Sequence, residues 1–160
     1  GTGHHATTRL MIHAMRDQVL PNASVLDFGT GTGVLAILAK KMGAGHVVGI
    51  DVEDWSVENA IENAQENKVN DIVFVCADRI TNSGPFDLVL ANINRNILLE
   101  HLSALQTVLA PSGRLIMSGI IEEDLPVMDQ ALVQQGFQRV SYDQEKGWVC
   151  IQLIHNQSNG

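Results

Sequence analysis

A glycine-rich turn directly after a short apolar segment is the feature that most restricts what this chain can fold into. Residues 24–28 are predicted to form a buried strand, and Gly29, Gly31 and Gly33 follow it before an apolar helix. Glycine lets the backbone turn sharply and approach a ligand closely, and the N-terminus of the next helix favours negative charge. In doubly wound α/β sheets, ligands bind at this place, beyond the carboxyl ends of the strands. The turn therefore indicates an α/β protein with a ligand site there, although a plain tight turn is the alternative.

The rest of the chain alternates predicted strands and helices. The predicted helices cover 9–20, 34–42, 54–67, 97–109 and 122–135, and the predicted strands cover 24–28, 46–50, 72–75, 86–91, 115–118, 137–142 and 148–154. This alternation predicts an α/β fold with a mostly parallel seven-stranded sheet and helices on both faces. The polar turn at 143–147 is too short for a parallel crossover, so we expect a C-terminal antiparallel hairpin.

Length and composition are those of one globular domain. The chain has 160 residues, of which 45% are hydrophobic and 18% are charged. Its formal net charge of −8 argues against a nucleic-acid binder held by a broad basic face. The two cysteines are far apart and have no CxxC spacing, which favours a reducing, cytosolic compartment over a disulfide framework or a zinc site. No apolar run reaches the roughly 18–20 residues of a transmembrane helix.

The spacing of the glycines distinguishes between two classes of ligand. A dinucleotide-binding turn has the spacing GxGxxG, which would place its third glycine at Val34. The chain instead has GxGxG over 29–33, with the acidic Asp27 before it. This arrangement resembles that of S-adenosylmethionine (SAM) methyltransferases and disfavours an NAD-dependent oxidoreductase. A non-catalytic nucleotide-binding module is a further alternative.

Polar residues end three more of the predicted strands. Asp51 ends the second, about 20 residues past the glycines, where a carboxylate can accept hydrogen bonds from ribose hydroxyls. The alternative is a cap of the next helix, for which Asp54 is the better candidate. Asp78 ends the third strand and is either an acceptor for an adenine amino group or an exposed turn residue. Asn92 ends the fourth and either offers its carbonyl to an amine in the cleft or is a loop residue before the next helix.

The first eight residues combine two glycines, two adjacent histidines and three threonines. Because no Cys, Asp or Glu stands near the histidines at ligand spacing, they are a poor metal site, and no metal is predicted. A loop whose hydroxyl and imidazole groups satisfy backbone groups is the simpler interpretation. The helix is then expected to begin after Thr7 and Thr8.

Together these motifs resemble the PrmA family, which methylates large-subunit ribosomal protein eleven. The N-terminal segment Gly1-Thr2-Gly3-His4-His5-Ala6-Thr7-Thr8 is similar to the family signature GTGxHxTT. The other matching motifs are Val25 to Gly33, Val48-Gly49-Ile50-Asp51, Ala91-Asn92-Ile93, Pro111-Ser112-Gly113-Arg114-Leu115 and Ser118-Gly119-Ile120. The resemblance covers essentially the whole chain. It implies a Rossmann-like class I SAM-dependent methyltransferase fold.

The resemblance also implies site residues and an activity. SAM contacts are expected from Thr8, Gly29, Asp51 and Asn92, with Asp27, Gly31 and Asp78 beside them and with a loop at Thr2 and Gly3 closing over the cofactor. Asn92 is also expected to position the substrate amine. The implied activity is methyl transfer from SAM to lysine and N-terminal amines of a ribosomal protein. A methyltransferase for another protein or a small molecule is the alternative.

Three departures from related patterns are visible. Thr30 and Thr32 replace the commoner cysteine and serine of the glycine turn, and residues 94–96 replace a Leu-Ala-rich stretch, which leaves the substrate contacts there open. The segment after Asn92 is not Asn-Pro-Pro-Tyr. The glutamine and adenine methyltransferases that use that motif are therefore disfavoured.

The chain begins with Gly-Thr-Gly rather than Met, directly at the family signature. Family members carry a separate N-terminal substrate-recognition domain before that signature. We therefore expect residues 1–155 to be the catalytic domain of a longer cytoplasmic protein, and residues 156–160 to be a frayed tail. The expected partner is a ribosomal protein, with no membrane and no direct nucleic-acid contact. The sequence does not predict an oligomeric state.

An acidic stripe marks the predicted helix 54–67. Asp54, Glu58, Glu62 and Glu66 recur every four residues and share one helix face. This stripe is either a solvated surface that keeps the domain soluble or a docking face for a basic protein.

Overall fold

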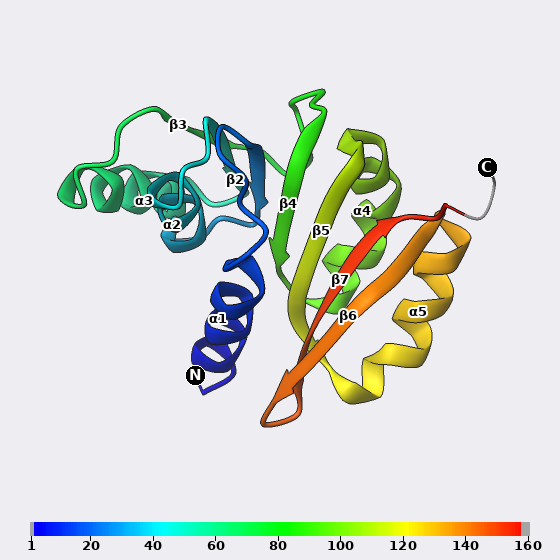
Figure 1. Ribbon diagram of the computed structural model, residues 1–160. Helices are drawn as coiled ribbons and strands as arrows, with labels where there is room; N and C mark the ends of the chain where they lie inside the picture. Colours follow the sequence, from blue (N-terminus) through cyan, green and yellow to red (C-terminus); the bar gives the residue numbers. More distant parts are fainter. Residues whose placement is uncertain (1, 158–160) are drawn as a thin grey trace.

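The computed structural model describes residues 2–157, with side chains described from His5 onward. Its centre is a seven-stranded sheet with the order β3-β2-β1-β4-β5-β7-β6 (Figure 1). The strands are β1 (Ser24–Phe28), β2 (His46–Asp51), β3 (Ile72–Cys76), β4 (Phe86–Asn92), β5 (Leu109–Ile121), β6 (Phe137–Glu145) and β7 (Trp148–His155). Strands β1 to β5 pair in parallel, whereas β7 runs antiparallel to both β5 and β6. The predicted mostly parallel sheet with a C-terminal antiparallel hairpin is confirmed.

Helices cover both faces of the sheet, as expected. They are α1 (Thr2–Met15), α2 (Val34–Lys41), α3 (Asp54–Glu66), α4 (Arg95–Val108), the short 3-10 helix η1 (Glu122–Asp124) and α5 (Leu125–Gln134). Alternate residues of β1 show why two layers form, because side chains point to opposite faces of a strand. Leu26 joins the apolar cluster that packs against α4 and α5, while Val25 joins the cluster that packs against α1 and α2.

The first helix differs from the prediction, which placed a loop over the first eight residues and a helix over 9–20. Helix α1 already begins at Thr2 and ends at Met15. The glycines and threonines disfavour a helix by propensity, but burial of Ala6, Leu10, Met11 and Met15 extends the apolar stripe of α1 toward its N-terminus. Packing of that stripe therefore outweighs the low intrinsic propensity.

Later boundaries also differ from the prediction, and β6 extends to Glu145, into the segment 143–147 predicted as a turn. Strand β5 begins at Leu109 rather than at 115, because Leu109 already pairs with Phe86 before an irregularity in the register. The predicted helix 122–135 is divided into η1 and α5, and Pro126 lies in the first turn of α5, where its missing N–H costs nothing.

The end of the chain is described only in part. The Asn156 N–H donates to the carbonyl of Gly136 at 2.7 Å, so this residue of the expected frayed tail is anchored. Residues 158–160 of that tail lie outside the described part of the chain. None of the helices within residues 2–157 has both the length and the apolar character needed to cross a membrane.

Candidate functional site

Two neighbouring cavities lie at the carboxyl ends of the parallel strands. The first has a volume of about 420 Å³ and the second about 370 Å³, and Gly29 and Ile93 line both. Of the residues predicted from the sequence, the first cavity contains Thr8, Asp27, Gly29, Gly31 and Asn92. The second contains Gly29, Asp51 and Asp78. The structure thus gathers predicted site residues from four strand ends and from α1 at one edge of the sheet.

The glycine turn has the geometry that its sequence suggests. Gly29, Gly31 and Gly33 have φ angles of 82°, 55° and 81°, which side-chain-bearing residues rarely adopt. A Cβ at Gly29 would collide with the Ile93 side chain, and one at Gly33 would lie 2.9 Å from the Cβ of Ala60. A Cβ at Gly31 would meet no described atom within 4 Å. Two of the glycines are therefore needed for packing, while the backbone at Gly31 is open for an approaching ligand.

Asp27 is a buried carboxyl group on the wall of the first cavity. It is 1% exposed, and its Oδ2 accepts a hydrogen bond from the Thr30 hydroxyl at 2.8 Å. Its Oδ1 is buried and has no hydrogen-bond partner among the described residues. Burial raises the pKa of Asp27 to about 6, against the opposing effect of the hydrogen bond from the Thr30 hydroxyl. An unpartnered carboxyl oxygen in this position suits a cationic group of a ligand.

Asp51 connects the end of β2 with the glycine turn. Its Oδ2 accepts from the Gly31 N–H at 2.8 Å, and its Oδ1 accepts from the Glu53 N–H at 3.0 Å. Because an ionised carboxylate has about four acceptor positions, two are left for ligand hydroxyls. The expectation that Asp54 caps α3 is wrong, since Glu53 occupies the cap position and Asp54 is the first helical residue.

The second cavity contains a histidine that the sequence analysis did not identify. Asp78 is exposed at the cavity, and its backbone carbonyl lies 3.1 Å from Nε2 of His101. The His101 ring packs against Phe28 with ring centroids 4.9 Å apart. Its position three residues after the buried Leu98 of α4 was the available signal, because such residues share a helix face.

Asn92 is the last residue of β4, half-buried, and lines the first cavity. The alternative role in starting the next helix belongs to Asn94, whose Oδ1 accepts from the Ile97 N–H at 3.1 Å as the N-cap of α4. Asn94 lines the first cavity as well, but its Oδ1 is engaged in this cap. Trp148, from the start of β7, lines the same cavity and was also not identified from the sequence.

Helix α1 borders the first cavity through Thr7 and Thr8. The expected closing loop at Thr2 and Gly3 is wrong in conformation, since both residues lie in the first turn of α1; the Thr2 side chain lies outside the described part. Helix α1 is tied to the tip of the β6–β7 hairpin by an ion pair in which Arg9 donates to both carboxylate oxygens of Glu145.

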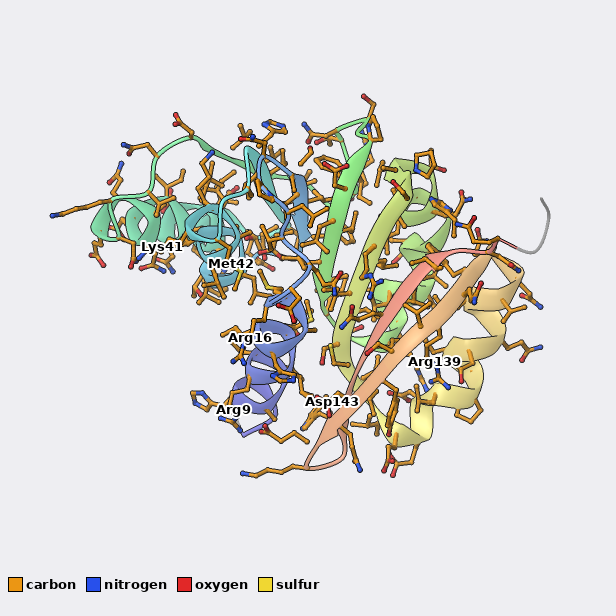
Figure 2. The ribbon with its side chains drawn as sticks, viewed as in Figure 1. Arg9, Arg16, Lys41, Met42, Arg139 and Asp143 are labelled. Atoms are coloured by element: carbon orange, nitrogen blue, oxygen red, sulfur yellow. The ribbon has the colours of Figure 1, made fainter. Side chains whose placement is uncertain are left out.

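A groove runs beside this ion pair. Figure 2 shows Arg9 and Arg16 on α1 and Asp143 on β6, and all three line the groove between the two elements. Among the described residues, no three His, Cys, Asp or Glu side chains are grouped so that they could hold a metal ion.

Comparisons with known proteins agree with this geometry. The profile of the family described as ribosomal protein L11 methyltransferase (PrmA) matches residues 1–156. The ribosomal protein L11 methyltransferase of Bacteroides thetaiotaomicron is 38% identical over 157 residues, which is 97% of this chain and 56% of that protein. Its counterpart in Porphyromonas gingivalis is 41% identical over 155 residues, covering 96% of this chain and 53% of that protein. The chain thus spans about half the length of these relatives.

Solved structures show the same relationship. The ribosomal protein L11 methylase of Lactobacillus delbrueckii subsp. bulgaricus superimposes with a TM-score of 0.90 at 36% identity, covering 94% of this chain and 79% of that one. The magnesium protoporphyrin IX methyltransferase of Synechocystis, solved with bound SAM, shares the fold at 22% identity, with a TM-score of 0.76 and coverage of 97% and 81%. The chain has the Rossmann-like class I methyltransferase fold and belongs to the ribosomal protein L11 methyltransferase (PrmA) family.

Proposed function

We propose that this chain is the catalytic domain of a SAM-dependent methyltransferase that modifies lysine and N-terminal amines of large-subunit ribosomal protein eleven. The observation that carries the proposal is the pair of cavities that meet at Gly29. Membership of the family and the names of its relatives support the substrate. A ribosomal-protein substrate would place the enzyme in the cytoplasm.

The first cavity fits the amino-acid part of SAM. The unpartnered Oδ1 of Asp27 matches a ligand ammonium group, and the open backbone at Gly31 leaves room for the ligand chain. Thr8 borders this cavity from α1, and we assign it a cofactor contact. Thr2 and Gly3 stay candidates only through the family resemblance.

The second cavity fits the nucleoside part. Asp51 has acceptor positions left for the two ribose hydroxyls, and Asp78 supplies an acceptor for the adenine amino group. Apolar walls from Phe28, Ile50 and Ile97 suit a purine ring.

The residues of the first cavity also suit an amine acceptor. When bound, SAM supplies a methyl group carried on a positively charged sulfur. A nucleophile placed in line with the sulfur–methyl bond can attack that methyl group. A lysine amine is protonated in water, with a pKa of about 10.4, and apolar surroundings lower that pKa. Trp148 and Leu35 contribute such surroundings, and the Asn92 carbonyl can accept an N–H of the neutral amine and so direct its lone pair.

Binding and product analysis test this function. Calorimetry on this chain is expected to show binding of SAM and none of NAD; tight binding of NAD without SAM would refute the proposal. Mass spectrometry of ribosomal proteins treated with SAM and a full-length version is expected to show methylated lysine and N-terminal amines. Methyl groups on another protein, or on a small molecule alone, would support the alternative substrates instead.

The domain assignment is part of the proposal. The two relatives are nearly twice as long as the matched region, since it covers 56% and 53% of them. This supports a division in which residues 1–155 carry the chemistry and other parts of such proteins contribute substrate recognition.

A further inference from the structure

His101 connects three elements around the second cavity. Its Nδ1 lies 3.0 Å from the carbonyl oxygen of Ile97 in the first turn of α4, and its Nε2 lies 3.1 Å from that of Asp78. Its ring packs on Phe28 at the end of β1, with ring centroids 4.9 Å apart and planes tilted by 55°. The imidazole is half-buried and lines the cavity itself.

The contact with Asp78 bears on the ligand. The Ala77 N–H still donates to the carbonyl of Asp51 in β2 at 2.9 Å, whereas residues 78–85 lie outside the helices and strands of the described chain. Asp78 lines the second cavity, and its backbone carbonyl oxygen lies 3.1 Å from Nε2 of His101. Both ring nitrogens face carbonyl oxygens, so the tautomer with its N–H at Nε2 donates to Asp78 and anchors the backbone of a residue that lines the cavity.

We propose that His101 is a positioning residue that makes the second cavity prefer a 6-aminopurine to a 6-oxopurine. This inference rests on the proposed function, in which Asp78 accepts a hydrogen bond from the purine amino group. A carboxylate is an acceptor only, so a 6-oxo group at the same place would set two acceptors against each other. Such discrimination depends on holding the carboxylate in place, because a mobile side chain turns away from the unfavourable group.

The chain offers a matched control in His155. Its Nε2 lies 2.9 Å from the carbonyl oxygen of Leu109, and its ring stacks on Phe137 with centroids 6.1 Å apart. His155 thus has the same kinds of contact as His101, but it lies at the end of β7 and lines neither cavity.

The test compares S-adenosylhomocysteine with S-inosylhomocysteine, which differ in the 6-amino and 6-oxo groups, by calorimetry. We expect the unmodified chain to bind the adenosyl ligand at least about tenfold more tightly. His101→Leu is expected to reduce this preference to about two- to threefold, mainly by weakening the adenosyl ligand. His101→Gln keeps an N–H donor and is expected to recover most of the preference, while His155→Leu leaves it unchanged. Thermal unfolding of each variant checks that the fold is retained.

Three results would overturn the inference. The first is an unchanged preference in both His101 variants, and the second is an equal loss of preference in His155→Leu. The third is an unmodified chain that binds both ligands equally well, which removes the inference about His101 but leaves the proposed function standing. If the unmodified chain binds neither ligand, the proposed function fails and this inference fails with it.

Discussion

Gly31 and Gly33 have similar left-handed backbone conformations but different surroundings. A Cβ at Gly33 would press on Ala60, whereas one at Gly31 would meet no described atom within 4 Å. We expect Gly31→Ala to cost roughly 1 kcal/mol of unfolding free energy through backbone strain, and to weaken SAM binding at least about tenfold. Gly33→Ala is expected to cost roughly 2–3 kcal/mol, because overpacking adds to the strain. Denaturant unfolding measures the loss of stability in both variants, and calorimetry measures their SAM affinities. Equal SAM affinities of Gly31→Ala and the unmodified chain would contradict the role of Gly31.

The raised pKa of Asp27 makes a prediction about stability and pH. Its pKa is about 6 in the folded protein, against an unperturbed value near 3.8. Between these values the folded state holds a proton that the unfolded state has released, so this group lowers stability as the pH rises from about 4 to about 6. The loss amounts to about 3 kcal/mol without ligand. This loss of stability is complete once the pH exceeds the pKa of Asp27 in the folded protein.

Asp27→Asn removes that titration. The variant is expected to gain stability over the unmodified chain as the pH rises from 4 to 7, and to bind SAM more weakly because the ligand ammonium loses its ionic partner. Urea unfolding at several pH values measures the first effect and calorimetry the second. A difference in stability that does not change with pH would contradict the assignment.

At the scale of elements, two nearby asparagines before helix α4 have different roles. Asn94 caps the helix by accepting from the Ile97 N–H, while Asn92 ends β4, and both residues line the first cavity. Asn94→Ala is expected to lower the unfolding free energy by about 1 kcal/mol with little change in the chemical step. Asn92→Ala is expected to leave stability nearly unchanged and to reduce kcat. Asn96→Ala, in the exposed first turn, is the control for both, and a lower kcat in Asn94→Ala alone would reverse the assignment.

Helix α3 carries the acidic stripe, whose members Glu58, Glu62 and Glu66 are exposed. Like charges four residues apart destabilise a helix by roughly 0.2–0.5 kcal/mol per pair. Glu58→Lys turns two such repulsions, with Asp54 and Glu62, into attractions, and we expect a gain of about 1 kcal/mol at low salt. Glu58→Gln should give about half of it. A loss of stability in urea unfolding would show that the stripe has partners other than solvent.

The elements also show where sequence patterns are sufficient to predict the bounds of a helix or strand. Strands β1, β2 and β4 were predicted to within one residue because each is a buried apolar run ended by a polar residue or glycine. The early start of α1 was missed, because its glycines and threonines are poor helix formers and burial against β5 and β7 decides the outcome. Local propensity cannot reveal a contact with strands that lie so far along the chain, at Leu109–Ile121 and Trp148–His155.

At the scale of the whole molecule, some site residues could be predicted from the sequence and others could not. Asp27, Asp51 and Asn92 each follow from one rule, since ends of neighbouring parallel strands meet at one edge. His101 and Trp148 reach the cavities from the middle of a helix and from a hairpin that closes the sheet. The spacing from Leu98 places His101 on the buried face of its helix, but the cavity that His101 or Trp148 reaches depends on packing between distant elements.

The last prediction concerns which functions belong to this chain and which belong to the regions of its longer relatives that it does not match. All the residues to which we assign SAM contacts lie in this chain, so it should bind SAM without help. The matched region covers only 56% and 53% of two relatives, and we expect a substrate-recognition part to lie outside it. Residues 1–160 alone should therefore show a SAM affinity within about twofold of that of a full-length version, but a kcat/KM for the ribosomal protein at least about a hundredfold lower. Parallel calorimetry and methylation assays measure the two quantities. Equal kcat/KM values would show that this domain recognises its substrate unaided.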